Sequence, residues 1–477
     1  LTATSLDISG DIDVDGTTNL DVVDVDGAVN FAADVTFADG ADIITASAGT
    51  SNFRAGVNAG NSIASGGDFN VVVGDEAGTA ITTGDKNVAL GYQALATEAT
   101  GYLNTAIGAG ALQTSNGAYY NVAVGHEAGN DITTGTHNTL IGALAGDALT
   151  TGSSNVAVGY GALTTDDVGQ WNVAIGRDAL SAQNIATAAN IYNTAVGGAA
   201  GVAITTGINN TLIGGLAGDA LTDADSNIAI GKSALTADTL GSKSIAIGDS
   251  ALGTQNFTTA TNAYNVAIGH HAGVLLTTGT NNTLIGALAG DAITTGASNT
   301  AVGDNALGAN TTASANVAIG RNAALSNTTG SSLVAVGYGA LQSNTEGANN
   351  TALGRNALLA NTTADYNVAV GYNAGTAVTT GVNNTLVGGT TGQALTTGGN
   401  NVAMGYGALY TDDVGSHSVA IGVSALQNQN TATAASVYNT AVGSQAGLSM
   451  TTGVQNTLVG ALAGDALTDA DFNVGIG

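Results

Sequence analysis

The sequence NVALG at residues 87–91 returns as NTAIG at 104–108, NVAVG at 121–125 and NTLIG at 138–142. Its closing glycine recurs 24 times from Gly74 to Gly477. Of the 23 intervals, 20 have the length from Gly74 to Gly91 and three have the longer length from Gly176 to Gly197. A period this short and strict is typical of a solenoid, whose coils each contact their neighbours, and not of a globular domain. We therefore predict a stack of about 24 β-coils over residues 70–477.

Both faces of the repeated strand are apolar. Val88 and Leu90 share one face by the period-two rule, and Ala89 lies on the other. We expect the aliphatic pair to face the core of the coil. Because a strand that is apolar on both faces is usually covered on both, we expect the alanine face to contact a neighbouring chain. The alternative is a wide single-chain solenoid with exposed alanines, which cost little; we favour self-association.

A longer unit of four coils overlies the 17-residue period. An alanine such as Ala94 follows the glycine by three positions in 22 of 23 places, and the next residue is Leu or Gly in runs of two. The strand leucine of the NTLIG and NTLVG variants returns after four coils each time, except for one step of six coils from Leu284 to Leu386. This spacing indicates duplication of a four-coil block with one irregular stretch. The three longer coils carry inserts that we expect to bulge from one corner, and these inserts end near Tyr192, Tyr264 and Tyr438.

Asparagine opens the phrase in 21 of 24 copies, and glycine closes it. The asparagines could form an amide ladder along the stack or cap only their own turns, and the sequence leaves both interpretations open. We predict that these positions are structural. Besides Asn87, Ala89, Leu90 and Gly91, the representative residues are Asn121, Gly125, Asn138 and Gly142.

The composition excludes several classes of partner. Seven basic residues stand against 35 acidic ones, for a net charge of −28, so nucleic acid and anionic membrane surfaces would repel the chain. Apolar stretches are far shorter than the roughly 20 residues that cross a bilayer, so we expect no membrane insertion. With no cysteine, the extracellular stability that we expect must come from hydrogen-bonded stacking. Since the chain opens at Leu1 and closes on a repeat at Gly477, we expect it to be part of a longer protein.

Residues 1–69 lack the phrase and alternate apolar with acidic residues, which predicts an acidic, strand-rich segment for attachment or capping. Asp11, Asp13 and Asp15 match the opening of a calcium loop, but Val22 stands where the bidentate glutamate belongs. Strand alternation explains this spacing without a metal, and calcium is the alternative.

The sequence indicates no catalytic or cofactor-binding residues. His270 and His271 are interpreted as exposed turn residues and not as a metal or acid–base pair. Asp166-Asp167 and Asp412-Asp413 recur in equivalent TDDVG turns, which favours a structural role. We therefore predict that the chain is not an enzyme and needs no cofactor.

The phrases NVAVGYGAL at residues 155–163, NTAIGAGAL at 104–112 and SIAIGDSAL at 244–252 resemble the head repeats of YadA-type trimeric autotransporter adhesins. The resemblance covers roughly residues 70–477 and implies a left-handed parallel β-roll that assembles as a homotrimer. The 17-residue coil is somewhat longer than is usual in those heads. With the TTG spacers and the opening LTATSLDISGDIDVDG, the chain looks more like the tail fibres of bacteriophages, particularly marine ones.

This resemblance implies an extracellular structural fibre of a phage tail or virion, which projects an element that contacts a host receptor or glycan and joins other virion subunits. Tyr192, Tyr264 and Tyr438 are the candidate contact residues. The alternative is a bacterial adhesin head or a surface filament on the cell. A third alternative, which the sequence favours least, is a polysaccharide-cleaving spike, since that needs carboxylates grouped with aromatics in irregular coils.

Overall fold

The structure is a computed structural model, and it describes residues 47–431, 433 and 435–477. The contacts divide the chain into Leu1–Ile44 and Thr45–Gly477, and the second unit is the solenoid. The predicted calcium residues Asp11, Asp13 and Asp15 lie outside the described residues, as does most of the predicted acidic segment. The described solenoid begins before residue 70, because β1 (Phe53–Ala55) pairs with β2 (Val71–Val73).

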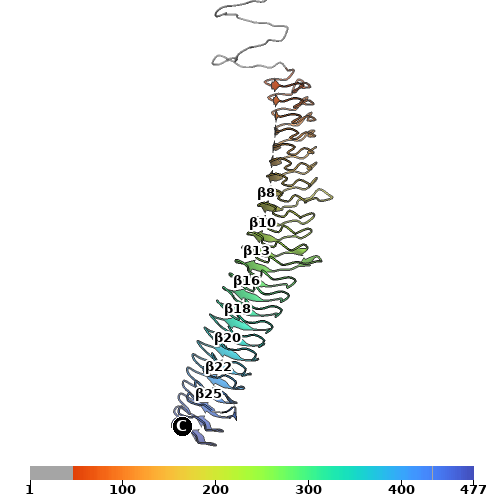
Figure 1. Cartoon of the computed structure of the whole chain (residues 1–477). Helices are drawn as coiled ribbons and strands as arrows, with labels where there is room; N and C mark the ends of the chain where they lie inside the picture. The colour runs from red at the N-terminus through yellow and green to blue at the C-terminus, as the bar shows by residue number, and fades with distance from the viewer. Residues whose placement is uncertain (1–46, 432, 434) are drawn as a thin grey trace, which may run out of the picture. The chain divides into compact units, whose positions relative to one another are not determined.

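One parallel sheet of 25 strands forms a wall of the solenoid, with one short strand from each coil (Figure 1). Each strand pairs in register with the strand one coil away, as Val88, Ala89 and Leu90 pair with Thr105, Ala106 and Ile107. The predicted all-β parallel solenoid of 17-residue coils is confirmed. Turns, and not a second strand, close most of each coil. None of the described residues forms a helix long and apolar enough to cross a membrane.

The remaining strands of this sheet are β3 (Val88–Leu90), β4 (Thr105–Ile107), β5 (Val122–Val124), β6 (Thr139–Ile141), β7 (Val156–Val158), β8 (Val173–Ile175), β9 (Thr194–Val196), β10 (Thr211–Ile213), β11 (Ile228–Ile230), β13 (Ile245–Ile247), β15 (Val266–Ile268), β16 (Thr283–Ile285), β17 (Thr300–Val302), β18 (Val317–Ile319), β19 (Val334–Val336), β20 (Thr351–Leu353), β21 (Val368–Val370), β22 (Thr385–Val387), β23 (Val402–Met404), β25 (Val419–Ile421), β27 (Thr440–Val442), β28 (Thr457–Val459) and β29 (Val474–Ile476). Two small parallel sheets pair β12 (Gly241–Ser242) with β14 (Thr261–Asn262) and β24 (Gly415–Ser416) with β26 (Ala435–Ser436). In each of these sheets a strand from a long coil, β14 or β26, pairs with a strand from the regular coil before it. Figure 1 shows inserts projecting beyond the neighbouring coils near β8 and β13, as expected.

The orientation predicted for the strand is wrong. Counting the opening asparagine as coil position 1, the alanine at position 3 is buried inside the coil, and Ala89 is 0% exposed. The aliphatic residue at position 4 points outward, with Leu90 44% exposed and Ile141 40% exposed. A 17-residue coil that turns sharply has a narrow interior. The methyl group of the one alanine at position 3 fits there, whereas the two larger side chains at positions 2 and 4 together would not.

Inside each coil, positions 9 and 12 fill the space in one of two complementary ways. Where position 9 is glycine, position 12 is a large buried aliphatic residue, as in Gly78 and Ile81; a Cβ on Gly78 would stand 2.7 Å from the Ile81 Cδ1. Where position 9 is Leu95, position 12 is the buried Glu98. The apolar interior of a coil thus takes at most one large aliphatic side chain from these two positions, and where position 9 is leucine the buried residue at position 12 is polar.

This alternation explains the four-coil period that the sequence shows. Leu140 occupies strand position 3, and its Cδ atoms stand 2.6 Å from a Cβ built on Gly129 of the preceding coil and 2.8 Å from one built on Gly146 of its own coil. A leucine at strand position 3 thus fits only where position 9 is glycine both in its own coil and in the preceding coil. Leu212, Leu284, Leu386 and Leu458 have the same surroundings.

The asparagines form a ladder that joins consecutive coils. The Asn299 backbone N–H donates to the Asn282 Oδ1 at 3.0 Å, and the Asn282 Nδ2 donates to the Gly296 carbonyl oxygen at 2.9 Å. In part of the stack the amides also bond directly, as the Asn299 Nδ2 does to the Asn282 Oδ1 at 3.1 Å. Of the two interpretations that the sequence left open, the ladder is therefore present, and most of the amides also cap the end of their own coil, whereas the Asn172 Nδ2 donates to the Asp166 carboxylate.

Candidate interaction surfaces

An uncovered aliphatic face runs along the outer side of the main sheet. It consists of the side chains at strand positions 2 and 4 in successive coils. The large residues of this face that are more than a third exposed include Val71, Leu90, Ile141, Ile175, Ile213, Ile285, Ile319, Val334, Leu353, Val368, Met404 and Val459. Because the strands stack in register, the side chains at position 4 form one continuous apolar row, and the row at position 2 beside it alternates between valine or isoleucine and threonine, as at Thr283 and Thr300.

Aromatic side chains border the aliphatic face on both sides. Position 6 carries Tyr92, Tyr160, Tyr338, Tyr372 and Tyr406, and the last position of the coil carries Tyr120, Tyr192, Tyr264, Tyr366 and Tyr438, which together make ten of the 13 tyrosines. All ten are exposed. Tyrosine recurs at these two positions in five coils each, and the coils between them carry other residues there, so the aromatic borders are interrupted while the face between them is not.

The three predicted contact tyrosines lie in the second of these borders and not at the tips of the inserts. Tyr192 stacks on Trp171 with ring centroids 6.4 Å apart, and Tyr438 stacks on His417 at 5.0 Å. The Lys243 ammonium lies 5.4 Å from the Tyr264 ring centroid. Each ring therefore packs on the side chain at the same position one coil earlier, while about half of its surface stays open to a partner.

A further aromatic cluster lies near the N-terminal end of the described solenoid. Tyr102 and Tyr119 stack at 5.1 Å, and Tyr120 stacks on His137 at 5.1 Å. Sequence reasoning missed these residues, although each pair is separated by one coil length and that spacing was the signal that could have found them.

The residues predicted to be structural are the asparagines, alanine, leucine and glycines of the repeated phrase. Asn87, Asn121 and Asn138 are buried in the ladder, while Gly91, Gly125 and Gly142 turn the chain at the corner with φ between 128° and 145°. A Cβ on any of these glycines would stand within 2.6 Å of the next glycine's carbonyl group. Glycine is therefore required at this corner.

The carboxylates of Asp166, Asp238 and Asp412 point into the coil and are fully buried. The Gly169 N–H donates to one Asp166 oxygen at 3.0 Å, and the Gln183 Nε2 donates to the other at 2.7 Å. Burial raises the pKa of Asp166 to about 6, and it also raises the pKa values of Asp238 and Asp412. Because these side chains are enclosed, they cannot reach a substrate on the surface.

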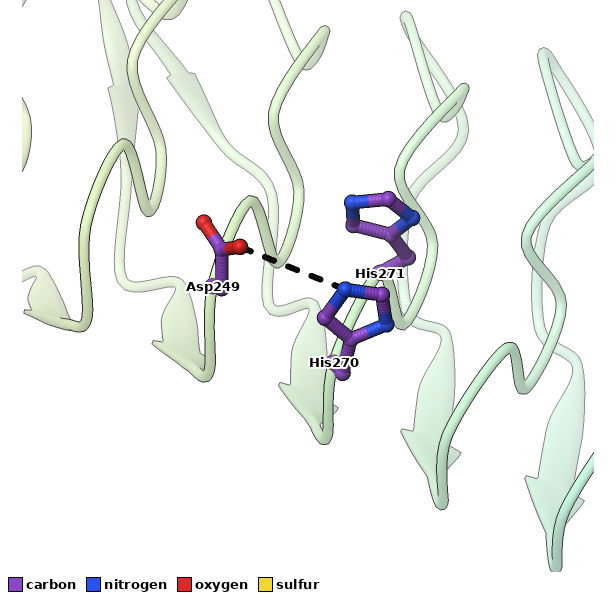
Figure 2. A group of neighbouring side chains, drawn as sticks. All are labelled: Asp249, His270 and His271. Carbon is purple, nitrogen blue, oxygen red and sulfur yellow. Dashed lines mark ion pairs between the residues drawn. The ribbon is translucent and has the colours of Figure 1, made fainter.

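Among the histidines, only the adjacent pair has a carboxylate from another coil beside it within the described residues. His270 and His271 lie next to Asp249, whose side chain occupies the same coil position as His270 one coil earlier (Figure 2). Sequence reasoning missed Asp249 because the coil between it and His270 is one of the three long ones. His126 lies near Glu127 of its own turn, and His137 and His417 stack on tyrosines.

No model of a known protein family matches this sequence. A search of curated proteins likewise gives no match.

Proposed function

We propose that this chain is a structural fibre protein that assembles with two further copies of itself through the aliphatic face. The observation that supports this is the continuous apolar row on the outer side of the sheet, which a monomer in water rarely exposes over such a length. The row repeats with the coil step of about 4.8 Å. A second copy of the chain has the same spacing of apolar side chains, so it can match this row along its whole length.

The proposed fibre belongs to a phage tail or virion, where it holds a host-contacting element away from its base. Regular stacking over 25 strands supports a spacer role, and the acidic surface supports an extracellular one. The exposed aromatic borders favour contact with a receptor or glycan, because aromatic side chains offer large contact area at low entropy cost. A bacterial adhesin head or surface filament is the alternative, and it uses the same face.

The test is the solution mass of the purified chain by light scattering, with negative-stain images of the same sample. We expect a mass of three chains, which is three times 46.0 kDa, and rods in the images. A monomer would contradict the proposal. Open-ended filaments would instead favour a surface filament.

A charge variant tests whether the aliphatic face carries the assembly. We expect the triple variant Ile141→Glu, Ile213→Glu and Ile285→Glu to dissociate to single chains, because each glutamate would have to be buried without a partner at the interface. The matched control, Thr134→Glu, Thr278→Glu and Thr380→Glu, adds the same charge at exposed turn positions and keeps the trimer mass. Circular dichroism of both variants shows whether the coils still fold. If the control dissociates as well, added charge and not the aliphatic face is responsible.

A further inference from the structure

We propose that Asp249, His270 and His271 bind one divalent first-row transition metal ion of the Zn²⁺ class. The three side chains come from two consecutive coils and point toward one another on the surface (Figure 2). The Asp249 Oδ2 lies 4.0 Å from the His270 Nε2, and one ligand atom from each of the three residues lies within 4.8 Å of the others. The site is independent of the proposed fibre function.

The distances are close to those of a coordinated ion. Tetrahedral ligands at 2.0–2.1 Å from zinc are about 3.4 Å apart. The imidazole rings of His270 and His271 stack with centroids 3.8 Å apart and planes 21° apart, so at least one ring has to turn before both nitrogens face the same ion. Because His270 and Asp249 are exposed and His271 is half-buried, these side chains are not enclosed in the core of the coil.

The backbone that carries these side chains is held by hydrogen bonds between coils. The His271 N–H donates to the Asp249 carbonyl oxygen at 3.0 Å, and the Leu288 N–H donates to the His270 carbonyl oxygen at 3.0 Å. The strands that precede the two turns, β13 and β15, are paired in register. The ligands are therefore positioned by the solenoid itself, which lowers the entropy lost when an ion binds.

The donor set selects the class of metal. Two imidazole nitrogens and one carboxylate oxygen suit Zn²⁺, Co²⁺, Ni²⁺ and Cu²⁺, whereas Ca²⁺ and Mg²⁺ prefer oxygen ligands alone. Three protein ligands leave a fourth position for water or for a further ligand.

Position 6 is a place where side chains of consecutive coils meet elsewhere in the stack. The Arg321 guanidinium Nε lies 3.3 Å from the Asp304 Oδ2 one coil earlier, and Arg355 lies between the rings of Tyr338 and Tyr372. At Asp249 the corresponding partners are imidazoles. Lys232 occupies position 6 one coil before Asp249, but among the described residues the ion pair of that carboxylate is with His270 and not with this ammonium.

The experiment is a titration of the full chain, prepared without a histidine tag, with Zn²⁺ by calorimetry in a buffer that contains excess Mg²⁺. The Mg²⁺ occupies the many exposed carboxylates of this acidic chain, so that the nitrogen-containing site is measured. We expect one ion per chain. Asp249→Asn, His270→Ala and His271→Ala should each weaken binding by about tenfold or more. Titration with Co²⁺ should give visible ligand-field bands that the double histidine variant loses.

His126→Ala is the matched control, because His126 is a single exposed histidine at the same coil position with a carboxylate of its own turn 3.7 Å away. It should bind Zn²⁺ as the unchanged chain does. Thermal unfolding of each variant without metal shows whether the coils remain folded. The proposal is overturned if the unchanged chain binds no Zn²⁺ above Mg²⁺, or if His270→Ala and His271→Ala bind it as tightly as the control.

Discussion

At the scale of single residues, most of the opening asparagines satisfy buried backbone groups in more than one coil. Asn282 accepts the Asn299 N–H and donates to the Gly296 carbonyl oxygen, and both partners are buried or nearly so in the stack. Where the ladder lacks an asparagine, another residue takes over part of its role. Leu333 replaces one, and the carbonyl oxygen of Gly347 accepts the Asn344 Nδ2 at 2.9 Å.

We predict that Asn282→Ala lowers the free energy of unfolding by about 2–4 kcal/mol, because it leaves two buried polar groups without their partners. Chemical denaturation measures this. Asn116→Ala, at an exposed position outside the ladder, should change stability by less than about 0.5 kcal/mol. Equal effects of the two substitutions would contradict the role of the ladder.

The corner glycine gives a second prediction at this scale. In Gly286→Ala the new Cβ would stand 2.6 Å from the Gly303 carbonyl carbon and oxygen, at a φ of +136° that side chains rarely adopt. We expect a loss of about 2 kcal/mol or more, or failure to fold. Gly215→Ala is the control, since its Cβ would meet the Gly198 carbonyl oxygen only at 4.0 Å and its φ lies outside the left-handed region. Melting curves of the two variants should differ clearly, and similar curves would show that the corner tolerates a side chain.

Much of the residue scale could be predicted from the sequence, but the inward face of the strand could not. The fixed spacing of asparagine, glycine and alanine marks their positions directly. Both Ala89 and Leu90 are apolar, so alternation separates two faces without saying which is inside. The width of the coil interior decides that question, and it depends on the turns, whose geometry the pattern does not give.

At the scale of the element, each long coil is joined to the coils before and after it by the same buried hydrogen-bond network. Asp166 accepts from Gln183, and the Gln183 Oε1 accepts from the Asn193 Nδ2 at 2.9 Å. The same contacts join Asp238, Gln255 and Asn265, and join Asp412, Gln429 and Asn439. The longer glutamine side chain thus reaches the ladder in the coils that carry the inserts.

This network predicts a pH dependence of stability. The pKa of Asp166 is about 6 in the folded chain against an ordinary value of 3.8, so the folded chain binds this proton at a higher pH than the unfolded chain. Its contribution to stability is therefore fully present below about pH 4 and is lost as the pH rises through 6. The difference corresponds to about 3 kcal/mol.

Urea unfolding midpoints of the chain and of Asp166→Asn, measured from pH 4 to 7.5, test this expectation. The variant should show a smaller change of stability across this range, since asparagine does not titrate. Asp131→Asn removes a charge at an exposed position and should keep the original slope. If Asp166→Asn also keeps the original dependence of stability on pH, Asp166 is not the titrating group.

At the scale of the whole solenoid, the repeat predicted the stacking but not the surfaces that result from it. The 17-residue period gave the parallel sheet. Self-association was expected from the two apolar strand faces and from the resemblance to trimeric fibres, but it was placed on the alanine face, which is buried inside the coil. The aliphatic face and its tyrosine borders emerge only when equivalent positions are placed one above another. Stacking also brings Asp249 and His270 together. The coil between them is a long one, so their separation in the sequence differs from the 17-residue period and does not mark them as neighbours.

The alternation of glycine and leucine at position 9 also limits how such a protein can change its length in evolution. Removing the coil that precedes a strand leucine, such as residues 121–137 before Leu140, would place that leucine beside a coil whose position 9 is Leu112, whereas removing four coils restores the original neighbours. Recombination between equivalent sites therefore preserves packing when it adds or deletes whole blocks. The irregular stretch from Leu307 to Leu358, with Leu or Ala at position 9 of four successive coils, lengthens the protein by two coils without placing a strand leucine between them.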